Sequence, residues 1–136
     1  LIKSAERDGV IAISNLAWDM SGNLCDYEVT YQSASLKCVT KVCGYMSEGF
    51  ALLLSELNSC MERDGGWSDE KSWASLEGEF ELSATADSLG HTTLQVSLAS
   101  GHYELDWRLR VGLVLDAHQL TEIARSANKF IENSDA

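Results

Sequence analysis

Hydrophobic and polar residues alternate with a period of two along most of the chain, and such alternation predicts strands with one buried face. In the first half it predicts strands over residues 10–18, 23–33 and 36–43. We expect the apolar side of the first strand to carry Val10, Ala12, Leu16 and Trp18.

A helical period replaces the alternation after residue 46. Ser47 is a suitable N-cap, since its hydroxyl can accept from the first free amides of a helix. The stretch "RDGG" (63–66) predicts the end of the helix, because glycine tolerates the left-handed C-cap geometry. The apolar stripe between these signals consists of Phe50, Leu53, Leu54, Leu57 and Met61.

The second half follows the same plan. Alternation predicts strands over 75–85, 91–98 and 103–115, joined by turns at "DSLG" (87–90) and "SGH" (100–102). Asp116 then caps a helix, and Gln119 completes a capping box with it. We expect this helix to bury Ala117, Leu120, Ile123, Ala124, Ala127, Phe130 and Ile131.

These elements predict an α+β fold. The expected architecture is an antiparallel sheet of about six strands in βββα-βββα order, with two helices packed on one face and water on the other. The 136 residues fit a single domain spanning 1–136, with an ordered core over about 9–132.

The charge balance limits the classes of partner. Ten basic and 21 acidic residues give a formal net charge of −11. Binding of a nucleic-acid backbone depends on Lys and Arg, so this charge argues against nucleic acid and favours a cationic partner. No apolar stretch is long enough for a transmembrane helix, and the first ten residues lack the order of a signal peptide. We therefore expect a cytoplasmic protein that does not bind membranes.

Three glutamates alternate with apolar residues between Leu76 and Leu82. Glu77, Glu79 and Glu81, the acidic row, are expected on the outer side of one strand, with neighbours about 6.5–7 Å apart. Arg108 and Arg110 would lie two strands away, near 9.5 Å, where they offset the row by only about 0.4 kcal/mol. The row is then either solvated surface or a recognition surface for a basic partner, formed by Asp69, Glu70, Glu77, Glu79, Glu81, Glu104 and Asp106.

Catalytic and metal-binding sites are less well supported. The separation of the three glutamates suits glycoside hydrolysis, but a flat, wet face provides nothing to shift a pKa. Asp87, His91 and His102 are suitable zinc ligands, but their turns lie at opposite ends of one strand, about 20–25 Å apart. We therefore expect no metal, no other cofactor and no enzymatic activity. A small hydrolase or metal-dependent enzyme with a site between helix and sheet is the alternative.

The four cysteines show no metal-binding spacing. Cys25, Cys38 and Cys60 occupy apolar positions of their elements and are expected to be buried free thiols. A cysteine nucleophile would need a nearby histidine and electropositive surroundings, which the surplus of acidic residues opposes.

Tryptophan, glycine, histidine and aspartate residues mark the second half at characteristic spacings, and we assign them structural roles: Gly66, Trp67, Trp73, Gly90, His91, Trp107 and Asp116. With these residues the second half resembles a small bacterial family of unknown function that is itself similar to immunity proteins encoded beside polymorphic toxins, including wall-associated contact-dependent toxins. The resemblance covers roughly residues 50–132, whereas residues 1–45 carry no such motif.

This resemblance implies a cytosolic, non-enzymatic protein that binds and neutralises a cognate toxin. Immunity proteins of this kind are often acidic when the toxin is a basic nuclease, and they mask its active site with carboxylates. The resemblance implies no catalytic residues, and the acidic contact residues come from the charge argument alone. We expect a monomer or a weak homodimer. A homo-oligomeric structural protein that pairs through an edge strand is a third hypothesis.

Overall fold

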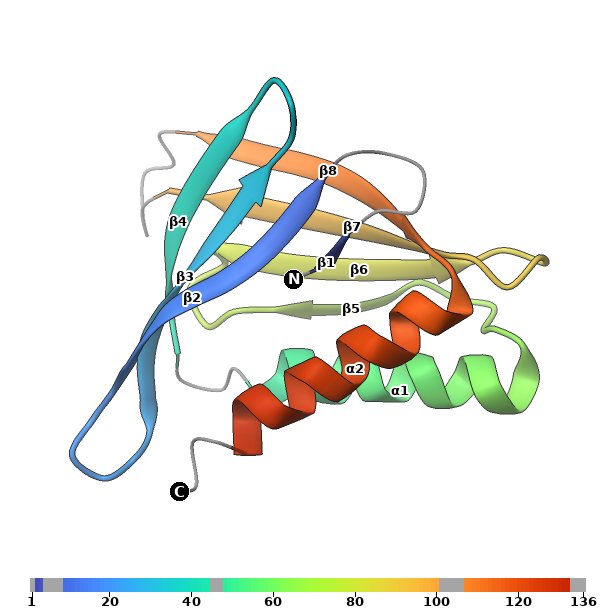
Figure 1. The fold of residues 1–136 in the computed structure, drawn as a ribbon, viewed down its shortest axis with the longest axis horizontal. Coiled ribbons are helices and arrows are strands. Elements are labelled where there is room, and N and C mark those ends of the chain that lie inside the picture. Colours follow the sequence, from blue (N-terminus) through green and yellow to red (C-terminus); the bar gives the residue numbers. More distant parts are fainter. Residues whose placement is uncertain (1, 4–8, 45–47, 101–106, 133–136) are drawn as a thin grey trace.

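The computed structural model describes residues 2–3, 9–44, 48–100 and 107–132, and within these ranges it has an α+β fold. Four strands and a helix are followed by four further strands and a second helix (Figure 1). The elements are β1 (Ile2–Lys3), β2 (Val10–Trp18), β3 (Leu24–Gln32), β4 (Lys37–Cys43), α1 (Glu48–Asp64), β5 (Lys71–Ala74), β6 (Phe80–Ala86), β7 (Thr92–Ala99), β8 (Arg108–Leu115) and α2 (Ala117–Glu132).

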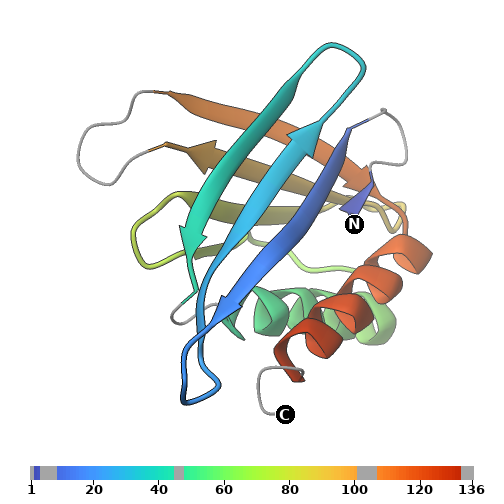
Figure 2. The ribbon, with the colours of Figure 1, turned by 60° about the vertical axis from the view of Figure 1, so that its left-hand side comes forward.

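The strands form two antiparallel sheets, and the prediction of one sheet of about six strands is wrong. The first sheet has the order β1-β2-β3-β4 and the second β5-β6-β7-β8. Each half therefore has the order ββββα, one strand more than predicted. The two sheets cross steeply instead of continuing one another (Figure 2). Twisted strands that bury one face each can share a core in this way without pairing across the two halves.

Both sheets turn their apolar faces toward one core, and the two helices pack on each other and against these faces (Figure 1). Phe50 of α1 marks the centre, because its ring centroid lies 5.7 Å from that of Trp73 in β5 and 6.3 Å from those of Tyr27 and Phe80. Further core residues are Ile11, Val29, Val42, Leu54, Leu57, Leu82, Leu94, Val96, Leu98, Leu113, Leu115 and Leu120. Among the described elements, neither helix lies on the outer face of the second sheet (Figure 1).

The predicted inward face of β2 is confirmed only for Leu16, since Trp18 is 38 % exposed and the first half of the strand has the opposite face inward. Ile11 is completely buried and Ile13 packs on the core, so Val10 and Ala12 lie on the other side. Asn15 has a φ of 52°, and the register with β3 shifts between Ser14 and Ala17. Such a bulge adds one residue and reverses the later side chains, which is how Leu16 still reaches the core.

The predicted start of α2 and the predicted end of α1 agree with the structure. The amide of Asp116 donates to Gln119 Oε1 at 3.0 Å, and the amide of Gln119 donates to Asp116 Oδ1 at 2.8 Å, which is a complete capping box. Gly65 ends α1 with a φ of 73° and donates to the carbonyl of Met61 at 3.0 Å. The predicted N-cap, Ser47, lies outside the described residues.

Candidate functional site

The acidic row does not form one strand face, because a tight turn interrupts the predicted strand over 75–85. β5 ends at Ala74 and β6 begins at Phe80. Between them the amide of Ser75 donates to the carbonyl of Phe80 at 2.8 Å, and Gly78, with a φ of 77°, donates to the carbonyl of Ser75 at 3.0 Å. The signal for this turn is Gly78, since glycine readily takes a positive φ.

Glu79 is buried, and its prediction as a surface contact is wrong. Its residue is 1 % exposed, and its carboxylate accepts from Ser75 Oγ at 2.6 Å and from the amide of Cys43 at 3.0 Å. Its carbonyl accepts from the amide of Ala99 at 2.9 Å. Since Cys43 belongs to the first sheet and Ala99 to the second, Glu79 joins the two sheets near the start of β6.

The other two glutamates of the row differ from each other. Glu77 is exposed in the turn, whereas Glu81 is half-buried on the outer face of β6. Arg108 Nη1 lies 3.6 Å from Glu81 Oε2 and donates to Ser97 Oγ at 2.6 Å. The long side chain of Arg108 in β8 therefore reaches across β7 to β6, and the predicted separation of 9.5 Å overestimated the distance between the charged groups.

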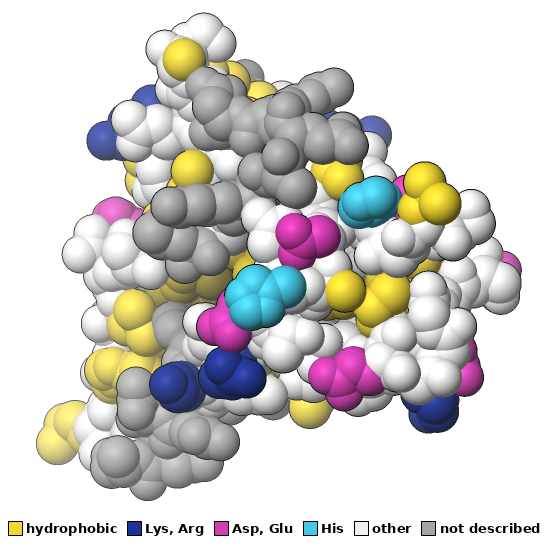
Figure 3. Space-filling model, turned by 45° about the vertical axis from the view of Figure 1, so that its right-hand side comes forward, with side chains coloured by type: hydrophobic (Ala, Val, Ile, Leu, Met, Phe, Trp, Pro, Cys, Tyr) yellow, Lys and Arg dark blue, Asp and Glu magenta, His cyan; other side chains and the backbone are white. Residues whose placement is uncertain are grey.

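Asp69 and Glu70, the two acidic residues before β5, are exposed as predicted. Glu104 and Asp106 lie outside the described residues. On the face shown in Figure 3, acidic side chains lie scattered among other residues and do not form one continuous patch.

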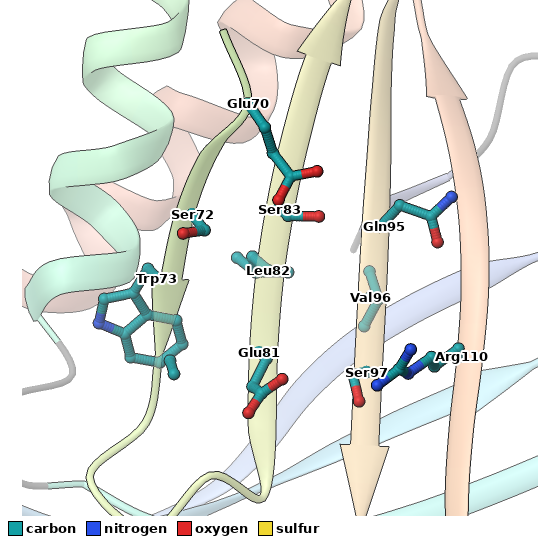
Figure 4. A pocket seen from close by; sticks show the side chains of 11 residues that line it. Glu70, Ser72, Trp73, Glu81, Leu82, Ser83, Gln95, Val96, Ser97 and Arg110 are labelled. Atoms are coloured by element: carbon teal, nitrogen blue, oxygen red, sulfur yellow. The ribbon is translucent and has the colours of Figure 1, made fainter.

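A hollow of about 790 Å³ lies on the outer face of the second sheet (Figure 4). Figure 4 shows Glu70 above Ser83 on one side and Arg110 pointing toward Ser97 on the other. Glu81 also lines the hollow. We call this site the hollow; its lining residues are Glu70, Ser72, Trp73, Ala74, Glu81, Leu82, Ser83, Gln95, Val96, Ser97 and Arg110.

Strand register divides the floor of the hollow into two rows. The uncharged row contains Ser72, Ser83 and Gln95, which line the hollow, and it continues to Gly112, which pairs with Gln95 but is not a lining residue. The carboxylate of Glu70 lies above Ser83 in this row. The charged row contains Ala74, Glu81, Ser97 and Arg110 in the same strand order. Carboxylates, hydroxyls, an amide and the guanidinium of Arg110 thus face solvent together on the sheet.

The predicted turn at 87–90 holds Asp87 and His91 together. Asp87 Oδ1 accepts from the amides of Leu89 and His91 at 2.8 and 2.9 Å, and Asp87 Oδ2 lies 3.2 Å from His91 Nδ1. These hydrogen bonds, above all the one from the amide of His91, lower the pKa of Asp87. His102 lies outside the described residues, and within the described ones no group of three or more metal-ligating side chains occurs.

The β2–β3 turn has the same construction as the turn at 87–90. Asp19 Oδ1 accepts from the amides of Ser21 and Asn23 at 2.8 and 2.9 Å, and the amide of Asn23 is the main cause of the lowered pKa of Asp19. Gly22 and Gly90 each have a φ of 84°. Because each half places this turn at the same point, the two halves are similar at the level of turn chemistry as well as element order.

The four cysteines are free, but each is only partly buried, so the prediction of full burial for Cys25, Cys38 and Cys60 is wrong. Cys38 lies on edge strand β4, where partial burial raises its thiol pKa. An edge strand has a neighbour on only one side, which leaves such side chains partly accessible.

A second cavity, of about 120 Å³, lies between the helices and the first sheet. This is the position that a site between helix and sheet would occupy, yet Ser126 is its one polar lining residue. The other lining residues are Ile2, Ile11, Ile13, Phe50, Leu54, Ile123 and Ala127. The lining therefore presents no titratable group for acid–base chemistry.

Comparison with protein families matches residues 3–134 to a family of unknown function, DUF6228. The chain belongs to this family. The DUF6228 match includes both sheets, so the first half is as much a part of the family as the second. No curated protein and no solved structure matches the chain. Among the described residues, neither helix is long and apolar enough to cross a membrane.

Proposed function

We propose that this DUF6228 protein is an immunity-type inhibitor, which binds and neutralises a cognate toxin with a basic domain such as a nuclease. The observation that carries the proposal is the hollow on the uncovered face of the second sheet, lined by Glu70 and Glu81. A protein with a net charge of −11 attracts a basic partner over several ångström, and a rigid concave face gives it a place to dock.

The proposed contact surface differs from the acidic row. It consists of Asp69, Glu70 and Glu81, with Glu77 at the adjacent turn, and it leaves out Glu79, which is buried. Serine hydroxyls and the amide of Gln95 supply hydrogen-bonding groups between the carboxylates. The proposal places the protein in the cytoplasm, where it would bind the nuclease before the nuclease reaches its substrate.

The test uses the product of the neighbouring gene, which the proposal expects to be the toxin. We expect co-expression of the protein to protect cells from that product, and we expect the association rate to fall as NaCl is raised. In the double variant Glu70→Lys plus Glu81→Lys, the rate should fall roughly tenfold, because both changes reverse charge on the docking face. Surface plasmon resonance measures the rate, and circular dichroism checks that the variant is folded.

Glu122→Lys is the matched control. Glu122 is exposed on α2, away from the outer face of the second sheet, so this change should leave the association rate near that of the wild type. A double variant that binds as fast as the wild type would exclude the hollow as the docking face. Absence of both binding and protection would reject the immunity function itself.

A further inference from the structure

The two rows of the hollow offer different electrostatic surroundings. In the charged row, Glu81 is already paired with Arg108, and Arg110 of the same row adds a second positive charge. In the uncharged row, no cation faces Glu70, which has no ion-pair partner within the described part of the chain. The negative potential of the hollow is therefore concentrated over the uncharged row, whereas Arg108 and Arg110 partly offset the charge of Glu81 in the other row.

Gly112 of the uncharged row has no role in the fold that requires glycine. It lies inside β8, it is not among the glycines with positive φ, and a Cβ at its position would meet Gln95 Nε2 at 3.5 Å, which is ordinary contact. Glycine inside a strand weakens the strand, and it is typical of places where a ligand or another backbone approaches closely. Here the open side of the residue is the outer face of the sheet.

The chemistry of the uncharged row suits an ammonium or guanidinium group. The hydroxyl oxygens of Ser72 and Ser83 and the amide oxygen of Gln95 can accept hydrogen bonds, and the carboxylate of Glu70 supplies the charge (Figure 4). A long aliphatic stem fits over the small side chains of Ser72 and Ser83, beside the side chain of Gln95. The hollow also has ample volume for one side chain.

From these observations we infer that the hollow is the pocket for a single arginine or lysine side chain of the partner, anchored by Glu70 over Ser72, Ser83 and Gln95. This inference rests on the proposed function for its partner, and it adds which half of the hollow is used and what occupies it. Glu70 is then the specificity-determining contact, and Gly112, next to Gln95 at the edge of the hollow, adds no side chain to the row.

The test needs no toxin, so that its result is independent of the proposed function. N-acetyl-arginine amide is titrated into the ¹⁵N-labelled protein, with N-acetyl-citrulline amide as the neutral isostere. We expect the arginine probe alone to shift the backbone amide signals of Ser72, Ser83, Gln95 and Gly112. Glu70→Gln should weaken its affinity about three- to fivefold, as for an exposed ion pair, whereas Glu122→Gln should leave it unchanged.

The variant Gly112→Leu tests whether the probe needs the space next to Gln95 at the edge of the hollow. A leucine in a strand is compatible with folding, and we expect the probe to cause no shift at Ser72 and Ser83 in this variant, while the urea midpoint stays at or above that of the wild type. Equal shifts from the citrulline probe, or unchanged affinity in Glu70→Gln, would overturn the inference. Either result would leave the proposed immunity function standing, because protection against the toxin is measured separately. Conversely, if the arginine probe binds but the toxin does not, only the proposed partner is rejected.

Discussion

At the scale of single residues, the main lesson comes from Glu79. Its place in an alternating sequence predicts exposure, but the turn over residues 75–79 directs its carboxylate inward to Ser75 Oγ and the amide of Cys43. A buried carboxylate is tolerated only when its oxygens are hydrogen-bonded. Glu79 is therefore part of the joint between the two sheets and not part of a docking surface.

Replacement of Glu79 should destabilise the fold. In Glu79→Ala, the amide of Cys43 and the hydroxyl of Ser75 lose their buried acceptor, and we expect the free energy of unfolding to fall by about 2–4 kcal/mol. Urea denaturation measures the change. Glu70→Ala is the control, because Glu70 is exposed and its loss should cost less than about 0.5 kcal/mol. Similar small losses for both variants would contradict the buried role.

The two aspartate turns should make stability depend on pH on the acid side. Hydrogen bonds from backbone amides lower the pKa of Asp19 and Asp87 below the ordinary aspartate value of 3.8. Their stabilisation is therefore present above that value and is lost as the pH falls through the lower, folded pKa. Asp19→Asn or Asp87→Asn keeps an acceptor but removes the titration. We expect each variant to lose less stability than the wild type between about pH 5 and about pH 2.

Thermal denaturation as a function of pH measures this effect. Asp69→Asn is the matched control, since Asp69 is an exposed aspartate that makes none of the hydrogen bonds described for the turns. If the thermal midpoint of both turn variants falls with decreasing pH as steeply as that of the wild type, the two turns do not contribute to the pH dependence.

At the scale of elements, the helices were predictable from local signals and the strand faces less so. The capping box of α2 involves only Asp116 and Gln119, which lie three residues apart. The inward face of β2 depends on the bulge at Asn15, and the start of β6 depends on the turn at Gly78. A period of two carries no information on where one residue is inserted, so a strand's faces are easily reversed.

The cap at Asp116 provides a test at this scale. Asp116→Ala should lower the free energy of unfolding by about 1 kcal/mol, because the amide of Gln119 loses its acceptor and the helix frays from its first turn. Asp116→Asn retains an oxygen at the same position and should recover most of the loss. Guanidinium denaturation measures both variants, and equal destabilisation by alanine and asparagine would contradict the cap.

At the scale of the whole molecule, the surplus of acidic residues dominates. A net charge of −11 on 136 residues produces mutual repulsion that opposes folding. The ion pairs formed by described residues, such as Lys71 with Glu56 and Arg125 with Glu122, are mostly exposed and contribute little. Salt should therefore weaken the repulsion between the acidic side chains more than it weakens the ion pairs.

We accordingly expect the protein to become more stable in salt. Raising NaCl from about 0.05 M to about 0.5 M shortens the screening length, and the midpoint of thermal unfolding should rise by about 2–5 °C. Calorimetry at pH 7 measures the shift. A midpoint that falls with NaCl would show that ion pairs outweigh the repulsion.

The sequence by itself determined the fold class, most strand positions, both helices and the excess of negative charge, because each depends on local periodicity, capping and composition. Only the tertiary structure decided that the strands form two sheets, that Glu79 is buried between them and that Arg108 reaches Glu81. These features depend on contacts between segments far apart in the chain, such as Cys43 with Glu79. Alternation specifies which residues share a face, but packing between the sheets decides which faces and edges meet water.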